Sequence, residues 1–249
     1  MEQYNPFSLE GNTILVTGAS SGIGQAIAIA CSKMGAKVIA TGRNEDRLIA
    51  TNSMLMGCEN QIIKCDLTQK DDVQNLISQI PQLNGVVHCA GIGHRKPAKL
   101  IDDSDINQVF QVNFNSVVLL QSALLAAKKI AKESSIVFIA SKAADFPSPG
   151  NAVYSASKGA IISYARCIAL ELAPRLIRVN CICPAMVWTD LIMQNEVTKE
   201  QLLEAEKQYP LKRYGTPDDI ANLAIYLLSK ASSWMTGNCV DITGGAKEL

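Results

Sequence analysis

The sequence predicts a single-domain α/β fold, in which helices cover both faces of a doubly wound parallel sheet of about seven strands. Three observations support this prediction. Short apolar runs alternate along the chain with segments whose apolar residues recur at helical spacing. The candidate strands read as continuous apolar runs, as expected of parallel strands that are buried on both faces. The 249 residues contain no repeat, low-complexity tract or Pro/Gly-rich linker that would divide them.

The strands are predicted from short runs rich in β-branched and other apolar residues, such as Ile-Leu-Val at 14–16. In chain order they cover residues 13–17, 37–41, 61–64, 85–89, 135–140, 177–182 and 239–242. Crossover connections between successive parallel strands are right-handed and place helices on both faces of the sheet.

The helices are predicted from apolar residues spaced near 3.6. These segments are 22–34, 107–131, 153–173 and 217–228. Pro217 stands at a helix start, where its missing N–H costs nothing, and Pro174 falls just after a helix. The interspersed charges of 199–207 are typical of the solvated face of a helix.

The composition is that of a compact globular protein. Hydrophobic residues make up 48%, charged residues 18%, and the formal net charge is zero, which argues against nucleic-acid binding. The N-terminal segment lacks the features of a signal peptide, and no later apolar stretch approaches the length of a membrane span. The eight cysteines lie mostly in apolar segments, which favours buried thiols in a reducing cytoplasm. Cys181 and Cys183 lack a second ligand pair, so we expect no metal site.

A glycine-rich turn joins the first predicted strand to the first predicted helix. It reads Thr-Gly-Ala-Ser-Ser-Gly-Ile-Gly and places glycines at Gly18, Gly22 and Gly24. Such glycines let the backbone turn tightly and approach a pyrophosphate, whose charge is stabilised by free N–H groups at the helix N-terminus. The turn therefore predicts a Rossmann-type dinucleotide site. The alternative is a tight turn without a ligand.

The end of the second predicted strand favours NADP(H) over NAD(H). NAD-binding proteins place a carboxylate here, on the ribose hydroxyl, whereas the additional phosphate of NADP requires an arginine. The sequence has Gly42 followed by Arg43. A guanidinium group can hold a phosphate with two parallel hydrogen bonds. Alternatively, Arg43 is a surface residue that pairs with Glu45 or Asp46.

Three polar residues predict acid–base chemistry on a carbonyl group. Tyr154 and Lys158 lie four residues apart in a predicted helix and so share one helix face. A free tyrosine has a pKa of about 10, and a nearby ammonium group stabilises the phenolate form. Ser141 follows the strand predicted over 135–140, at the end where parallel sheets carry their ligand crevice. Its hydroxyl can donate a hydrogen bond to the carbonyl oxygen. In isolation, the Tyr–Lys pair would be more typical of an ordinary helix surface.

Over nearly its whole length the chain resembles the short-chain dehydrogenase/reductase family, most closely the 3-oxoacyl-acyl-carrier-protein reductases. The matching features are the glycine turn, Cys65-Asp66-Leu67, Asn113, Ser141, Tyr154 with Lys158, Pro184 with Thr189, and Gly244-Gly245. The resemblance implies that Tyr154 is the acid/base, that Lys158 stabilises it and binds the nicotinamide ribose, and that Ser141 orients the substrate. It implies that Asn113 holds a water of the proton relay. The implied cofactor-binding residues are Gly18, Ser20, Ser21, Gly22, Ile23, Gly24, Arg43, Asp66, Leu67, Ala90, Gly91, Tyr154, Lys158, Pro184, Val187 and Thr189.

Two of these implied contacts have a structural alternative, and two positions depart from the family pattern. Asp66, which would contact adenine, could instead cap a turn or helix, and Thr189, which would contact the nicotinamide carboxamide, could cap the following helix. His88-Cys89 stands where the family has two asparagines, and Ala185 where it has glycine. We interpret His88 as structural rather than catalytic, because the family's acid/base is already present.

The resemblance extends to the substrate class only weakly. Residues 190–214 are expected to cover the substrate, and 210–221 resemble the 3-oxoacyl-acyl-carrier-protein reductases, which implies a 3-oxoacyl thioester. A sugar, polyol or hydroxysteroid dehydrogenase is the alternative within the family. A catalytically silent NADP(H)-binding sensor or scaffold is the alternative of another class. The resemblance also implies a homotetramer. From the cysteines, the charge and the lengths of the apolar stretches, we expect a cytoplasmic protein with no nucleic-acid or membrane partner.

Overall fold

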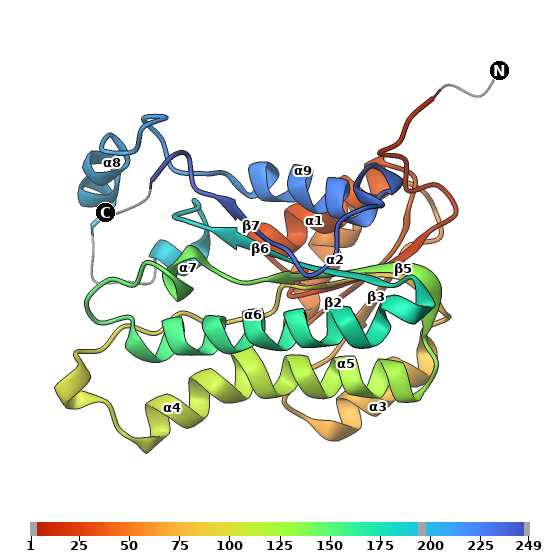
Figure 1. Ribbon diagram of the computed structural model, residues 1–249, viewed down its shortest axis with the longest axis horizontal. Helices are drawn as coiled ribbons and strands as arrows, with labels where there is room; N and C mark the ends of the chain where they lie inside the picture. Colours follow the sequence, from red (N-terminus) through yellow and green to blue (C-terminus); the bar gives the residue numbers. More distant parts are fainter. Residues whose placement is uncertain (1–3, 194–197, 247–249) are drawn as a thin grey trace.

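The computed structural model describes residues 4–193 and 198–246, which form a seven-stranded parallel sheet flanked by helices (Figure 1). The sheet order is β3-β2-β1-β4-β5-β6-β7. The strands are β1 Thr13–Thr17, β2 Lys37–Gly42, β3 Gln61–Lys64, β4 Leu83–His88, β5 Ile130–Ile139, β6 Arg178–Pro184 and β7 Cys239–Ile242. The predicted fold class is confirmed.

The order of the strands creates a switch point between β1 and β4. The chain builds outward from β1 to β3, returns to pair β4 with the other side of β1, and then builds outward to β7. The connections that leave β1 and β4 therefore diverge to opposite faces of the sheet. In open parallel sheets, ligands bind in the crevice beyond the carboxyl ends of such strands.

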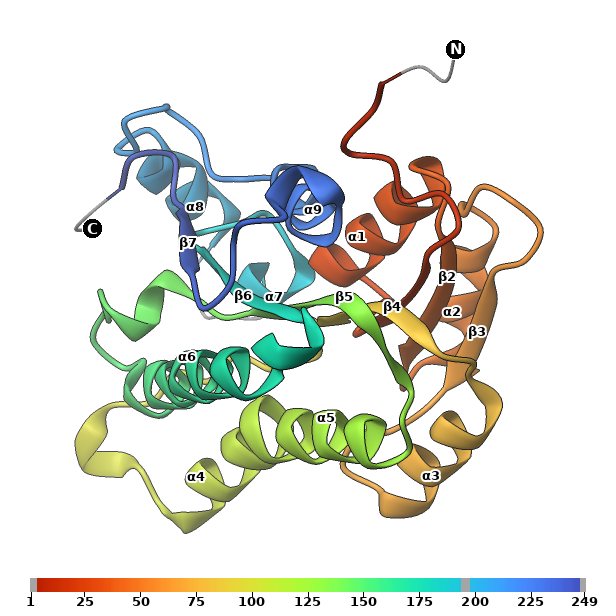
Figure 2. The same ribbon diagram turned by 45° about the vertical axis from the view of Figure 1, so that its right-hand side comes forward.

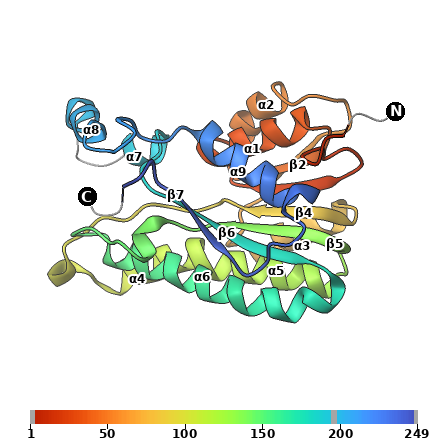
Figure 3. The same ribbon diagram turned by 45° about the horizontal axis from the view of Figure 1, so that its top comes forward.

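Helices cover both faces of the sheet, as Figures 2 and 3 show. One face carries α1 Gly22–Lys33, α2 Glu45–Asn52 and α9 Pro217–Leu228. The other carries α3 Lys70–Gln79, α4 Asp103–Phe110, α5 Ser116–Ala126 and α6 Ala152–Leu172. Beyond the carboxyl end of β6 lie α7 Asp190–Met193 and α8 Lys199–Glu206. A π-helical turn, Gln111–Asn115, joins α4 to α5, and short 3₁₀ turns cover Ala98–Leu100, Lys142–Ala144, Ala173–Arg175 and Lys230–Ser232.

The alternation of side chains along β1 explains why the strands read as continuous apolar runs. Leu15 packs into the core on the α5 and α6 face, whereas Ile14 and Val16 pack into the core on the α1 and α9 face. All three are fully buried. Because successive strand residues point to opposite faces, a strand that is covered on both sides needs apolar residues at every position.

The boundaries predicted for the helix over 107–131 are wrong at both ends. The helical stretch begins at Asp103, because Asp102 caps it by accepting hydrogen bonds from the backbone N–H groups of Ser104 and Asp105. It ends at Ala126, and Lys128 then adopts a positive φ of 54° as the chain turns back. Residues 130–131 consequently start β5, where Ile130 pairs with Leu83.

The expectation that no apolar segment approaches the length of a membrane span is wrong for this helical stretch. Residues Asp103–Ala126 form 24 helical residues with a mean hydropathy of 1.4, which suffices for a span by length and composition alone. The helix lies against the sheet, where Val117, Leu120 and Leu124 are almost fully buried in the core. Its apolar character is therefore that of a helix covering a sheet face.

Candidate active site

A cleft of about 640 Å³ opens beyond the carboxyl ends of the strands, at the switch point of the sheet. It is lined by Ser141, Tyr154 and Lys158 and by every residue predicted to bind the cofactor. Asn113 lies behind the wall of the cleft and is almost fully buried. The fold therefore brings together residues that are up to 171 positions apart in the sequence, from Gly18 to Thr189.

The glycine turn at the base of the cleft requires residues without side chains. Gly18 has a φ of +66°, and a Cβ atom built on it would lie 2.9 Å from the backbone of Ala90. A Cβ atom on Gly24 would lie 2.3 Å from the carbonyl oxygen of Gly18. Gly22 also has a positive φ, of +53°. Close approach between the turn, β4 and α1 explains Gly18 and Gly24, and the positive φ explains Gly22.

The N-terminus of α1 opens into this turn. Ser21 occupies the N-cap position, yet no side-chain hydrogen bond caps the helix within the described chain. The amide groups of the first turn are therefore available to an anion, which the helix dipole also favours. This arrangement, with the cradle left by the glycines, fits the pyrophosphate of a dinucleotide.

Two arginines lie at the β2 end of the cleft. Arg43 is exposed and makes no ion pair with any described residue, so the alternative pairing with Glu45 or Asp46 is absent. A Cβ atom on Gly42 would lie 3.3 Å from Oγ of Ser20, so a longer acidic side chain would crowd the glycine turn. Arg47, which the sequence analysis missed, also lines the cleft, and its guanidinium group lies 3.3 Å from the carboxylate of Asp190 in α7.

Asp66 caps a turn, which was the alternative to its predicted contact with adenine. Its Oδ1 atom accepts hydrogen bonds from the backbone N–H and the hydroxyl of Thr68, at 2.9 and 2.8 Å. This turn follows β3 and leads toward α3. Asp66 also lines the cleft, so its contact with adenine stays a prediction.

Tyr154 and Lys158 lie on one face of α6, as their spacing predicts. The Lys158 Nζ atom lies 5.8 Å from the centre of the Tyr154 ring and donates a hydrogen bond of 2.8 Å to the carbonyl oxygen of Ile139. Lys158 is only 6% exposed and has no carboxylate partner among the described residues. A buried ammonium group without a counter-ion favours a negative charge nearby, such as a phenolate.

Ser141 stands at the end of β5 with its hydroxyl in the cleft. Its Oγ atom accepts a hydrogen bond of 3.1 Å from the backbone N–H of Ala143. Because Oγ is the acceptor in this bond, the hydroxyl proton remains available for a carbonyl oxygen. Ser141 and Tyr154 therefore offer two O–H donors to the same cleft.

The side chain of Asn113 holds the loop after β4 in place. Its Oδ1 atom accepts from the N–H of Ile92 at 2.8 Å, and its Nδ2 atom donates to the carbonyl oxygen of Ile92 and to Oγ of Ser157. Asn113 lies in the π-helical turn, a distortion that is frequent at functional sites. It thus connects the loop at Gly91 to α6. Its role in a proton relay stays a prediction.

His88 agrees with the structural interpretation. It is buried outside the lining of the cleft, stacks on Phe138 at 4.7 Å and forms a 2.9 Å hydrogen bond with the Gln121 side chain. The hydroxyl of Thr17 contacts the residues that follow His88. It accepts hydrogen bonds from the N–H groups of Cys89 and Ala90 and so ties β1 to the end of β4.

His88 should make the stability of the protein depend on pH. Burial lowers the pKa of its imidazole from 6.5 to about 4. The unfolded chain therefore binds an additional proton between these values, and stability falls as the pH drops below 6.5. We expect wild type to lose about 2 kcal/mol more unfolding free energy between pH 7.5 and 5 than His88→Asn. Urea unfolding of both proteins at the two pH values measures this difference, and equal losses would contradict the prediction.

The segment after β6 carries the remaining predicted cofactor contacts. Ala185 does not have a positive φ, so its methyl group introduces no backbone strain where the family has glycine. Val187 forms an isolated bridge with Gly215. The hydroxyl of Thr189 donates to the carbonyl oxygen of Val187 at 3.3 Å, rather than accepting from a helix amide as an N-cap would.

Only part of the predicted covering segment, 190–214, lies over the cleft. Leu191 and Ile192 line it, and a Cβ atom on Gly93 would lie 3.3 Å from Cδ1 of Leu191. Leu202 of α8 does not line the cleft and packs into a small apolar cluster with Ile192, Tyr209 and Tyr214, of which Ile192 and Tyr209 also line the cleft. Residues 194–197 lie outside the described residues.

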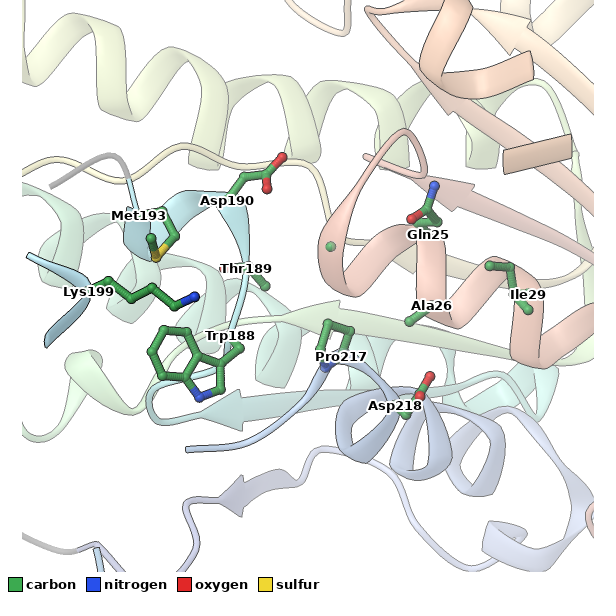
Figure 4. A pocket seen from close by; sticks show the side chains of 11 residues that line it. Gln25, Ala26, Ile29, Trp188, Thr189, Asp190, Met193, Lys199, Pro217 and Asp218 are labelled. Atoms are coloured by element: carbon green, nitrogen blue, oxygen red, sulfur yellow. The ribbon is translucent and has the colours of Figure 1, made fainter. Parts of the chain in front are cut away.

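A second groove, of about 580 Å³, lies behind the glycine turn (Figure 4). It runs between α1, the segment at Trp188, and the start of α9 at Pro217. Gly22, Thr189 and Asp190 line both this groove and the cleft, so the two hollows share a wall.

Comparisons with known proteins extend over nearly the whole chain. The family model described as "Enoyl-(Acyl carrier protein) reductase" matches residues 18–247. The 3-oxoacyl-[acyl-carrier-protein] reductase FabG of Rickettsia bellii is 36% identical over 238 residues, which cover 95% of this chain and 97% of the relative.

Two solved structures are similar in both sequence and shape. A short-chain dehydrogenase/reductase of the glucose/ribitol dehydrogenase type from Brucella melitensis is 34% identical, with a TM-score of 0.89 over 97% of this chain and 98% of the other. A candidate NAD(P)-dependent gluconate 5-dehydrogenase from Beutenbergia cavernae, with NADP bound at low occupancy, is 31% identical. Its TM-score is 0.86 over 97% of this chain and 98% of the other.

Proposed function

Because the chain belongs to the short-chain dehydrogenase/reductase family, a family of oxidoreductases, we propose that it reduces a carbonyl group to an alcohol with NADPH. The observation that carries the proposal is the convergence of Ser141, Tyr154 and Lys158 on one cleft with the glycine turn. When bound, the cofactor supplies the hydride. The glycine turn and the N-terminus of α1 would hold its pyrophosphate.

The side chains of the cleft perform the proton chemistry. Ser141 and Tyr154 donate hydrogen bonds to the carbonyl oxygen and polarise the carbonyl group. Tyr154 then gives its proton to the oxygen as negative charge develops there. Lys158, buried and without a counter-ion in the described structure, stabilises the resulting phenolate and would also bind the nicotinamide ribose. No proton has to come from a metal-bound water in this scheme.

The unpaired Arg43 supports a preference for NADP(H). We expect Arg43→Ala to raise the Kd for NADPH about tenfold to a hundredfold, because charge-assisted hydrogen bonds to a phosphate contribute about 1.5–3 kcal/mol. The Kd for NADH should change little. Fluorescence titration measures both, with Lys64→Ala as a control that removes a nearby exposed cation outside the cleft. Wild-type turnover with NADH that matched or exceeded turnover with NADPH would contradict the assignment.

We propose a 3-oxoacyl thioester as the substrate, since the relative from Rickettsia bellii is a 3-oxoacyl-[acyl-carrier-protein] reductase. A sugar or polyol is the alternative, favoured by the names of the two structural relatives, and a hydroxysteroid is a further one. NADPH consumption with acetoacetyl thioesters, keto sugars, steroids and diketones tests the proposal. Turnover restricted to sugars would replace the thioester with the alternative.

A catalytically silent cofactor-binding sensor is the competing function of another class. It would retain the glycine turn without needing Ser141, Tyr154 and Lys158 together. The presence of all three in the cleft argues for an enzyme. NADPH binding without turnover of any carbonyl in the panel would favour the sensor.

We also propose that the protein is a cytoplasmic homotetramer without nucleic-acid or membrane partners. Support for assembly comes from apolar side chains on the outer surfaces of the helices, where Leu119 of α5 is 62% exposed and Leu170 of α6 is 78% exposed. Such residues can be covered by a second copy. Light scattering measures the oligomeric state.

A further inference from the structure

We infer that Arg95 selects a carbonyl substrate that carries a carboxylate or a phosphate group. This inference rests on the proposed function and narrows its substrate. Arg95 lies in the loop after β4 and lines the same cleft as Ser141 and Tyr154. It is exposed and follows β4, which β1 separates from β2, at whose end Arg43 is placed to bind the cofactor.

The neighbours of Arg95 are both tied to the start of α4, and of the two only His94 also lines the cleft. His94 Nε2 lies 3.0 Å from Oδ1 of Asp105, and Lys96 forms ion pairs with Asp102 and Asp105 at the start of α4. These contacts fix the loop on both sides of Arg95. The loop thus presents the guanidinium group to the cleft from an anchored backbone.

A second contact brings Arg95 close to the catalytic helix. The backbone N–H of Lys96 donates a 2.8 Å hydrogen bond to the carbonyl oxygen of Gly150, and a Cβ atom on Gly150 would lie 3.1 Å from Cγ of Arg95. Gly150 has a φ of +85° and directly precedes the N-cap residue of α6. Because Tyr154 lies in the first turn of this helix, Arg95 is held beside the end of α6 that carries Tyr154.

Arg95 has no counter-ion of its own. It makes no ion pair with any residue in 4–193 or 198–246. Apart from Arg43 and the buried Lys158, the other lysine and arginine side chains that line the cleft are partnered, the half-buried Lys142 by Asp145 and Asp241, and the exposed Arg47 by Asp190. An unpaired guanidinium group in a concave site attracts anions and matches the planar geometry of a carboxylate or the oxygens of a phosphate.

The inference separates the substrate candidates by charge. Neutral sugars, polyols and steroids carry no anionic group that could pair with the guanidinium group of Arg95. An oxo acid offers a carboxylate, and a thioester of a phosphopantetheine arm or a sugar phosphate offers phosphate oxygens. The shared chemistry is an anionic group on the same molecule as the reacting carbonyl.

Matched substrate pairs with the same reacting carbonyl test the inference in the NADPH-loaded enzyme. One pair is acetoacetyl-coenzyme A with the neutral acetoacetyl-N-acetylcysteamine. A second pair is a keto-aldonic acid with its methyl ester. The first pair tests whether Arg95 recognises a phosphate group, and the second pair tests whether it recognises a carboxylate. Arg95→Gln removes the charge, Arg95→Lys retains it without the planar donors, and Lys99→Gln is the control, an exposed lysine in the same region that does not line the cleft.

We expect Arg95→Gln to lower kcat/KM about tenfold to a hundredfold for the anionic member of at least one pair, mainly through KM. The neutral member and the Kd for NADPH should change less than about twofold. Arg95→Lys should lose less, and Lys99→Gln should resemble wild type. Equal losses on both members of each pair, or no loss on any, would overturn the inference while leaving the proposed function standing. If wild type reduced no carbonyl at all, the proposed function would fail, and this inference with it.

Discussion

Tyr154→Phe is expected to lower kcat by about a hundredfold to ten-thousandfold, while the protein still folds and binds NADPH. Positioned general acids contribute rate factors of this size. The variant removes one oxygen atom from the cleft and retains the ring beside Lys158. The polarising hydrogen bond and the transferable proton are lost together. Single-turnover reduction of a good substrate measures the effect on the chemical step.

The same helix offers a matched control for this substitution. Tyr164 of α6 packs edge-on against Phe138 and Phe114 and lies outside the cleft. Burial raises the pKa of its phenol to about 12, so it is not suited to proton exchange at neutral pH. Tyr164→Phe should therefore reduce substrate at the wild-type rate. A Tyr154→Phe protein with an unchanged rate would remove Tyr154 from the mechanism.

Lys158→Ala is expected to impair both rate and cofactor binding. The buried ammonium group stabilises negative charge on Tyr154 and would donate to the nicotinamide ribose, so both functions depend on one side chain. We expect kcat at saturating NADPH to fall at least about a hundredfold and the Kd for NADPH to rise about tenfold. Stopped-flow reduction and fluorescence titration measure the two effects separately.

The control must account for the hydrogen bond to Ile139 that this variant also loses. Lys129 makes a comparable bond, because its ammonium group donates to the carbonyl oxygen of Ile80 outside the cleft. Lys129→Ala should cost stability without lowering the rate at saturating NADPH. A Lys158→Ala protein whose kcat matched that of Lys129→Ala would show that Lys158 is structural.

The long, buried elements could be predicted from the sequence because their apolar residues repeat at the period of the element. The short helix α2 could not be, because only Leu48 and Thr51 are buried within it, which is too few to show a helical period. The helix α3 was missed although its apolar residues Val73, Leu76 and Ile77 and its C-cap Ile80 follow the helical spacing. The signal for α2 was the cap residue Asn44, whose side chain accepts from the N–H of Arg47.

The candidate site divides in a similar way between local and distant contacts. The glycine turn and the pair Tyr154 and Lys158 depend on spacing within one segment, so their juxtaposition is readable in the sequence. The pairing of Arg47 with Asp190 joins residues 143 positions apart. The hydroxyl of Thr17, which accepts from Cys89 and Ala90, likewise acts between β1 and β4. Only the folded sheet brings such residues together.

The most direct test of the account is the transfer of deuterium from NADPH that is deuterated at its reactive ring carbon. The wild-type enzyme should place one deuterium on the carbinol carbon of the product, as mass spectrometry and NMR would show, and Tyr154→Phe should place it there far more slowly. An enzyme that bound the labelled cofactor tightly yet delivered no deuterium to any carbonyl of the panel would contradict the assignment as a reductase.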